Sequence, residues 1–230
     1  KANLAVKYLQ RYTGNSCHDV LRQCGLYGVD HCTEFNKTPL MLAAGAGNIN
    51  LIQELLAAGA DTDIIDNCGR TAWQCALNNV LSDKKFASSL FPAVNELLAP
   101  SSLSLKADNR LIKIDSSQGE FMLFHIFFVL LASCSTRLKQ RGHPLNAVAL
   151  SDITALLPDS IIPEYRKRRQ YISALLAKNE TESGNPYCRR LFKRVKTGYY
   201  ILSPGLQIRH KDNWTDIYRF AGIETIYRIF

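Results

Sequence analysis

The sequence lacks the long apolar runs that membrane-spanning helices require. Its main apolar run, FMLFHIFFVLLA, occupies residues 121–132 and includes His125, whereas a spanning helix needs about 20 apolar residues. We therefore predict a buried core helix here and no membrane partner. A signal-peptide pattern is also lacking, so we expect an intracellular protein of the cytoplasm or nucleoid, or of the nucleus if the source is eukaryotic.

The seven cysteines lack the even number and regular spacing of a disulfide framework, which favours a reducing compartment. We predict buried thiols and loop histidines rather than a metal site, because the densest group of potential ligands matches no zinc-finger spacing. That group comprises Cys17, His18, Cys24, His31 and Cys32.

Catalytic motifs are lacking as well. The chain contains no phosphate-binding glycine loop and no GxSxG, HExxH or CxxC. In the second half, carboxylates such as Asp152, Asp159, Glu164 and Glu180 are spread over separate predicted elements, which argues against a nuclease-like cluster. We predict a non-catalytic protein without a cofactor. If the chain is a fragment of a larger protein, catalysis could belong to the remaining part.

The net charge of +8 is confined to one half of the chain. Residues 1–118 contain 11 Lys and Arg against 11 Asp and Glu, whereas residues 119–230 contain 17 against 9, and 17 − 9 = +8. Such asymmetry indicates two parts with separate tasks, and an acidic partner for the second.

The first half repeats itself with a period of 33 residues. Thr38 aligns with Thr71, Pro39 with Ala72, and Ala43 with Ala76. Residues 36–77, which begin NKTPLMLAAGAGN, therefore contain one full unit and the start of the next. The opening TPL, the paired alanines, the Leu-Leu pair and the terminal GAD resemble the ankyrin repeat.

The resemblance gives particular residues structural tasks. Thr38 is expected to cap a helix whose first turn contains Pro39. Leu55 and Leu56 are expected to fill the groove between units, and Gly59 to end the second helix in the left-handed conformation. A degenerate earlier unit is expected over about residues 3–35. About nine additional residues around NVLSDKKFASS separate the helices of the last unit, which we expect to be a modified cap.

Ankyrin repeats generally bind other proteins, so the resemblance implies a protein ligand for residues 1–100. An alternative is that the stack only packs on the neighbouring domain. Loops project from the rigid helices, so contacts are expected at loop tips. The candidates are Asp61, Asp63, Asp66, Asn67 and Arg70.

The second half changes in pattern. Residues 101–118 look like a linker or short hairpin, and a long apolar helix is predicted over about residues 119–138. A short helix capped by Ser151 and ended by Pro158 follows, then a helix that begins after Pro163. The last part, CRRLFKRVKTGYYILSP, reads as two strands joined at Gly198.

Helices followed by a hairpin resemble a winged helix-turn-helix domain, here placed at residues 119–230. A weaker resemblance links it to the HARE-like winged helices of bacterial restriction systems and chromatin proteins. The predicted fold class is therefore mainly α, with a short ankyrin-repeat stack followed by an α+β winged-helix domain.

The resemblance implies that the helix after Pro163 is a recognition helix for duplex DNA. At 100° per residue, Tyr165, Ile172 and the Leu175–Leu176 pair fall on the core side. Cations in the first turn oppose the helix dipole, which favours an anionic partner. The residues expected to contact DNA from this helix are Arg166, Lys167, Arg168, Arg169, Gln170 and Lys178.

The hairpin would add phosphate contacts, and so affinity should fall steeply with salt. Its candidates are Arg190, Lys193, Arg194 and Lys196. The tail DNWTDIYRFAGIETIYRIF has near-helical apolar spacing, which predicts either a helix docked on the core or a homodimer seam.

Two functional interpretations remain open at this point. In the first, the chain is an adaptor or regulator that docks a protein and holds duplex DNA, or the C-terminal region of a larger DNA-processing protein. In the alternative, it is a scaffold or bacterial effector whose winged helix also binds protein.

Overall fold

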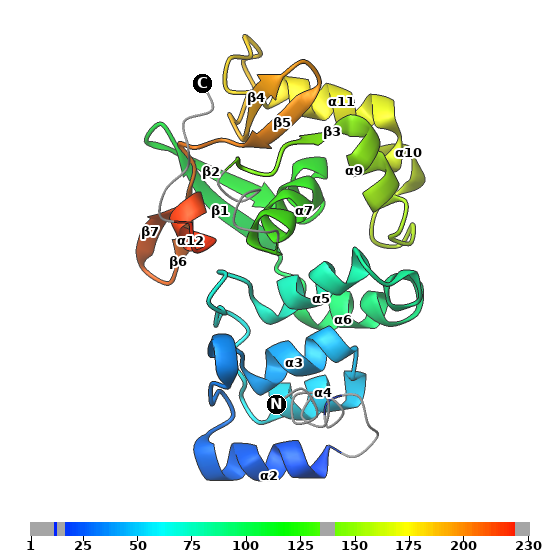
Figure 1. Cartoon of the computed structure of the whole chain (residues 1–230), viewed down its shortest axis with the longest axis vertical. Helices are drawn as coiled ribbons and strands as arrows, with labels where there is room; N and C mark the ends of the chain where they lie inside the picture. Colours follow the sequence, from blue (N-terminus) through cyan, green and yellow to red (C-terminus); the bar gives the residue numbers. More distant parts are fainter. Residues whose placement is uncertain (1–11, 13–16, 134–140, 224–230) are drawn as a thin grey trace. The chain divides into compact units, whose positions relative to one another are not determined.

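The computed structural model describes Tyr12, residues 17–133 and residues 141–223. The chain divides into two compact units, Lys1–Ala99 and Pro100–Phe230 (Figure 1). Of the degenerate repeat expected over about residues 3–35, residues 3–11 and 13–16 lie outside the described residues.

The first unit is helical. Its helices are α2 (His18–Tyr27), α3 (Pro39–Ala46), α4 (Ile49–Ala57), α5 (Ala72–Val80) and α6 (Phe91–Leu98). Figure 1 shows α2, the pair α3–α4 and the pair α5–α6 as successive layers. Between α2 and α3 lies the short turn η1 (Glu34–Asn36), and η2 (Phe86–Leu90) leads into α6.

The helix starts follow the predicted repeat. The hydroxyl of Thr38 accepts a hydrogen bond from the Met41 amide at 3.3 Å, and Pro39 is the first residue of α3. One period later, Thr71 caps α5 and Gln74 completes a capping box. Gly59 has φ +87° just after α4, as a left-handed helix end requires.

Small and apolar side chains close the core of the first unit. Ala43 and Ala44 are fully buried on α3, where they allow close helix approach. Leu55 is also fully buried, whereas Leu56 is half-buried, so only the first member of the pair fills the groove completely. In the additional segment before α6, Phe86 and Leu90 lie directly against Gly47 of the preceding repeat.

The second unit contains two antiparallel sheets. The hairpin β1 (Ser102–Ala107) and β2 (Arg110–Asp115) forms where a linker or short hairpin was expected. It continues through β6 (Gln207–His210) and β7 (Asn213–Asp216) in the order β2-β1-β6-β7. The other sheet has the order β3-β5-β4 and contains β3 (Leu145–Asn146), β4 (Phe192–Lys196) and β5 (Tyr199–Leu202).

Helices of the second unit surround a very apolar core. Almost all of α7 (Gly119–Ser133) is buried, including His125, as the apolar run predicts. The predicted extension of α7 to residue 138 falls beyond the described part of this segment. Next in the chain come α9 (Ala147–Thr154), α10 (Glu164–Lys167) and α11 (Arg169–Lys178), and α11 packs on α9.

Two helix boundaries differ from the prediction. Asn146, not Ser151, caps α9, because its side chain accepts a hydrogen bond from the Ala149 amide at 2.8 Å. Ser151 lies inside α9 and donates instead to the carbonyl oxygen of Lys167 at 2.7 Å. The helix predicted after Pro163 is broken at Arg168, which has ψ 133° and separates α10 from α11.

The tail is not the predicted continuous helix in its described part. Trp214 pairs with Arg209 between β7 and β6, so this residue lies in a strand. Helix α12 (Ile217–Phe220) is short, and Asp216 caps it by accepting hydrogen bonds from the amides of Tyr218 and Arg219. The residues from 224 onward, on which a homodimer seam would partly depend, lie outside the described residues.

Candidate interaction surfaces

The first unit presents two neighbouring loops, which we call finger 1 (residues 33–37) and finger 2 (residues 66–70). In finger 1 the amide of Thr33 donates to the carbonyl oxygen of Lys37 at 2.9 Å. In finger 2 the amide of Asp66 donates to the carbonyl oxygen of Arg70 at 3.0 Å. The fingers therefore close in the same way, one period apart in the sequence.

Asp66 and Arg70 stabilise finger 2 from within. Their side chains form an ion pair at 2.7 Å and are 2% and 13% exposed. The Asp66 carboxylate also accepts hydrogen bonds from the amides of Cys68 and Arg70, at 2.9 and 3.0 Å. The prediction that these two side chains project from the loop tip is therefore wrong, because closure of the loop uses both of them.

The other predicted contact residues of this surface are exposed. Asp61, Asp63 and Asn67 all face solvent. The sequence prediction missed Phe35 at the tip of finger 1, whose side chain is exposed. Its φ of 62° lies in the left-handed region that bulky side chains rarely adopt.

Hydrogen bonds hold the two loops side by side. The amide of Asn67 donates to the carbonyl oxygen of Phe35 at 3.2 Å, and the Asn36 side chain donates to the carbonyl oxygen of Ile65 at 3.1 Å. Further back, the amide of Asp61 donates to the Asp30 carboxylate at 3.1 Å. Fingers 1 and 2 thus form one surface.

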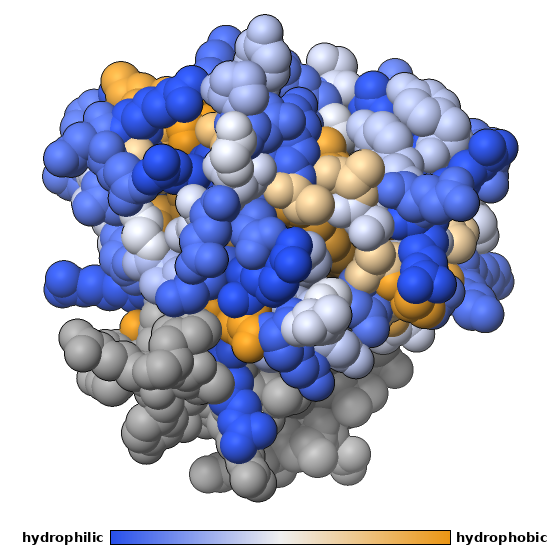
Figure 2. All heavy atoms as spheres, turned by 90° about the horizontal axis from the view of Figure 1, so that it is seen from above, coloured by the Kyte–Doolittle hydropathy of each residue, from blue (hydrophilic) through white to orange (hydrophobic). Residues whose placement is uncertain are grey.

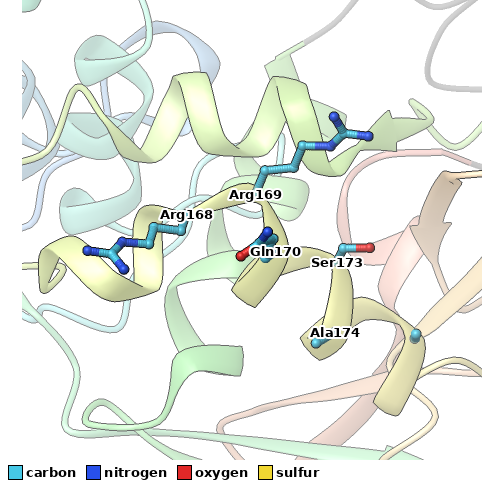
Figure 3. A pocket seen from close by; sticks show the side chains of 6 residues that line it. Arg168, Arg169, Gln170, Ser173 and Ala174 are labelled. Atoms are coloured by element: carbon cyan, nitrogen blue, oxygen red, sulfur yellow. The ribbon is translucent and has the colours of Figure 1, made fainter.

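In the second unit, α11 has a buried side and an exposed side. Ile172, Leu175 and Leu176 face the core, as predicted. An open depression lies along the exposed side (Figure 3), and small side chains leave room there for a partner. Its lining residues are Arg168, Arg169, Gln170, Ser173, Ala174 and Ala177.

The two arginines at the start of α11 are available to a partner. Both are exposed, and their side chains form no hydrogen bond or ion pair with the described residues. In Figure 3 they point in opposite directions, Arg168 over α10 and Arg169 away from it, with Gln170 between them.

The residues just before the helix break do not face as predicted. Lys167 is buried, with its ammonium group donating to the carbonyl oxygen of Leu157 at 2.7 Å and to the Asp159 carboxylate. Tyr165, predicted to face the core, is 51% exposed. Arg166 donates to the Tyr165 hydroxyl at 2.9 Å and to the carbonyl oxygen of Ser117 at 2.6 Å. The break at Arg168 changes the helical phase on which the prediction rested.

Carboxylates neutralise several of the remaining predicted cations. Arg194 pairs with Glu180 at 2.6 Å, and Arg190 pairs with Asp108 at 2.7 Å. Lys178 lies 3.8 Å from Glu120. On the β4–β5 hairpin, the Lys196 ammonium sits 4.0 Å from the centre of the Tyr199 ring, and Lys193 is half-buried.

A buried polar network fixes α11 against its neighbours. The fully buried Asn179, just after α11, donates to the Glu120 carboxylate of α7 at 3.2 Å and accepts from the Arg189 amide at 3.2 Å. The Arg189 guanidinium donates to the Gln118 side chain at 3.1 Å. The network joins α7, α11 and the segment leading to β4, and so fixes the position of α11 relative to these elements.

The face seen in Figure 2 is hydrophilic over most of its area, with several smaller apolar areas between. Across the described residues, no three His, Cys, Asp or Glu side chains are grouped so as to hold a metal ion. None of the helices that the structure describes is long and apolar enough to cross a membrane.

Comparison with known proteins identifies the first unit. A search of curated proteins finds no match to the chain. Residues 3–98 match the family model for ankyrin repeats (three copies). The match includes the degenerate first repeat and the modified last repeat. Residues 3–98 therefore contain ankyrin repeats, as the 33-residue period predicts.

Proposed function

We propose that the protein is a non-catalytic adaptor. In this proposal the ankyrin repeats dock a protein, and the second unit is a winged helix that binds duplex DNA. The two activities belong to separate units of the chain, in line with the neutral first half and the basic second half of the sequence.

A protein-docking role is what ankyrin repeats suggest, and the finger surface supports it. Phe35, Asp61, Asp63 and Asn67 are exposed on loops that hydrogen bonds hold together. Rigid loops lose little conformational entropy on binding, which favours recognition by such a surface.

The winged-helix assignment is supported by element order and strand pairing. Helices α7, α9 and α11 precede the β4–β5 hairpin, and β3, which lies between α7 and α9, pairs with β5. In a winged helix, this arrangement places the third helix, here α11, on the DNA-binding face.

The pair of unengaged arginines at the start of α11 carries the DNA-binding proposal. Arg168 and Arg169 would contact phosphates, and Gln170 would lie near base edges. Ser173, Ala174 and Ala177 are exposed and small, so a DNA groove could approach the helix closely.

Fluorescence anisotropy tests this proposal on the full chain with a labelled random duplex of about 20 base pairs. The double substitution Arg168→Ala/Arg169→Ala is expected to weaken binding by about tenfold or more and to reduce the salt slope by roughly two. Lys84→Ala/Lys85→Ala removes the same charge from exposed residues of the first unit and should leave affinity unchanged. Equal losses in both variants would contradict the proposal.

The second candidate is a scaffold in which α11 also binds protein. The internal pairing of Arg190, Arg194 and Lys178 with carboxylates favours it, because paired cations attract a polyanion less strongly. Absence of duplex binding by the wild-type chain at about 50 mM salt would select this candidate.

A further inference from the structure

Phe35 is an aromatic residue whose side chain is largely exposed at the tip of finger 1. We propose that its ring anchors a partner segment that is both apolar and basic, with the basic side chains meeting Asp61 and Asp63. The inference rests on the proposed docking role of the ankyrin repeats and names the chemistry of the partner.

The conformation of Phe35 is unfavourable in two respects. Its side chain is 71% exposed and its φ is 62°, a combination that costs free energy without any burial to offset it. The position one period later is Cys68, which is not among the residues with positive φ. At the next position, Asn36 and Gly69 both have positive φ, of 59° and 75°, so Phe35 is the departure from the repeat.

Hydrogen bonds hold the backbone that carries the ring before any partner arrives. The carbonyl oxygen of Phe35 accepts the Asn67 amide at 3.2 Å, and the neighbouring Asn36 side chain donates to the Ile65 carbonyl oxygen at 3.1 Å. These bonds hold the peptide group that follows the Phe35 Cα atom and so limit rotation of the backbone there. An exposed aromatic ring on a fixed backbone is the kind of anchor that dominates binding energy at protein interfaces.

The loop that leads into finger 2 carries two exposed carboxylates, and the cations of the two fingers, Lys37 and Arg70, are half-buried. Asp61 and Asp63 are exposed and form no ion pair with the described residues. The Asp30 carboxylate accepts a hydrogen bond from the Asp61 amide, so Asp30 adds a third carboxylate next to Asp61. Arg70, the cation of finger 2, is half-buried and forms an ion pair with Asp66. Charge complementarity therefore requires Lys or Arg in the partner.

The two requirements fit a single segment. Apolar side chains would cover the Phe35 ring, and an Arg or Lys beside them could lie over the ring face as well as reach the aspartates. An acidic or wholly polar segment would leave the ring in water and would be repelled by Asp61 and Asp63.

The experiment selects binders from a phage-displayed library of random peptides of about 12 residues on the full wild-type chain. The selected peptides are then sorted by whether they also bind the Phe35→Gly variant. This variant deletes the ring, and glycine suits the left-handed backbone, so its melting temperature should equal or exceed that of the wild type. Leu26→Ala is the matched control, because Leu26 is also 71% exposed.

Selected peptides should combine apolar residues with Lys or Arg. In anisotropy with the synthetic peptide, Phe35→Gly should weaken binding by about tenfold or more, and Asp61→Asn/Asp63→Asn by several-fold with a shallower salt dependence. Leu26→Ala should have no effect. Acidic consensus peptides, or no peptide specific for the ring, would overturn the inference. Peptides that bind another part of residues 18–98 would overturn it too, while leaving the docking role intact.

Discussion

The ammonium group of Lys167 forms an ion pair with the carboxylate of Asp159, although the lysine side chain is 9% exposed and the aspartate side chain 69%. Lys167 also donates to the Leu157 carbonyl oxygen at 2.7 Å. Its own carbonyl oxygen accepts from Ser151 at 2.7 Å. These bonds hold the break between α10 and α11 and separate an inward-facing cation from the exposed Arg168.

Replacing Lys167 with methionine should destabilise the second unit by about 1–3 kcal/mol. Methionine fills similar space but leaves the Leu157 carbonyl oxygen without its donor. The change in the free energy of unfolding is measured by urea denaturation, from the shift in the midpoint of the second unit's transition.

Arg168→Met is the matched control for this prediction. Its side chain is exposed and forms no bond with the described residues, so the change should stay within about 0.5 kcal/mol of zero. Equal destabilisation by the two substitutions would show that Lys167 does not fix the helix break.

Lys167 and Arg168 show which features the sequence could predict and which it could not. The 33-residue period specifies local features such as the Thr38 cap and the Gly59 helix end, and both are confirmed. The helix break depends on Ser151 and Asp159, which are distant in sequence, so a 100° periodicity could not reveal it. For the same reason the pairing of β1 with β6 left no local pattern, since their residues Leu105 and Ile208 are far apart in the chain.

In finger 2, Asp66→Asn should destabilise the first unit by about 2–3 kcal/mol. The substitution removes the charge that pairs with the half-buried Arg70 and weakens the hydrogen bonds from the loop amides. Thermal or urea unfolding of the full chain measures it. Asp63→Asn makes the same chemical change at an exposed position and should cost less than about 0.5 kcal/mol; a comparable loss there would contradict the structural task given to Asp66.

His125 should make the second unit less stable in acid. Burial lowers its pKa from 6.5 to about 3, so the unfolded chain binds its proton first as the pH falls. Between these two values the unfolded state holds more protons, and stability decreases with falling pH by up to about 1.4 kcal/mol per pH unit. Above pH 6.5 this contribution is constant.

Substitution of His125 by leucine should remove that part of the pH dependence, whatever its effect on stability at neutral pH. Denaturant unfolding at several pH values compares the slopes, and the carboxylates common to both proteins cancel in the difference. Identical slopes in the wild type and His125→Leu would contradict the assignment.

Carboxylates beside the hairpin should restrain DNA binding. Glu180 holds Arg194 at 2.6 Å and Asp108 holds Arg190 at 2.7 Å. The double substitution Asp108→Asn/Glu180→Gln should release both cations and raise duplex affinity several-fold at low salt. The affinity should also fall more steeply with salt, as expected for up to about two additional phosphate contacts. Anisotropy at two salt concentrations measures this change.

Asp212→Asn controls for a general effect of net charge. Its side chain is fully exposed and lies 3.8 Å from Arg209, outside α11 and the β4–β5 hairpin. An affinity gain per charge as large as that of Asp108→Asn/Glu180→Gln would show that net charge, rather than release of Arg190 and Arg194, governs binding.

The candidate surfaces were only partly predictable. Asp61, Asp63, Asn67, Arg168, Arg169 and Gln170 are exposed where their patterns place them. Asp66 and Arg70 pair with each other, which a prediction made for each loop residue separately does not reveal. Phe35 could have been found, since Phe35-Asn36 aligns with Cys68-Gly69 and places a large apolar residue in a tight turn.

Amide hydrogen exchange with and without a random duplex of about 20 base pairs tests the division of labour most directly. Exchange is expected to slow in residues 168–178 and 192–202 when the duplex is added, and to stay unchanged in residues 18–98. Protection confined to residues 18–98, or no protection anywhere at a duplex concentration that saturates binding, would contradict it.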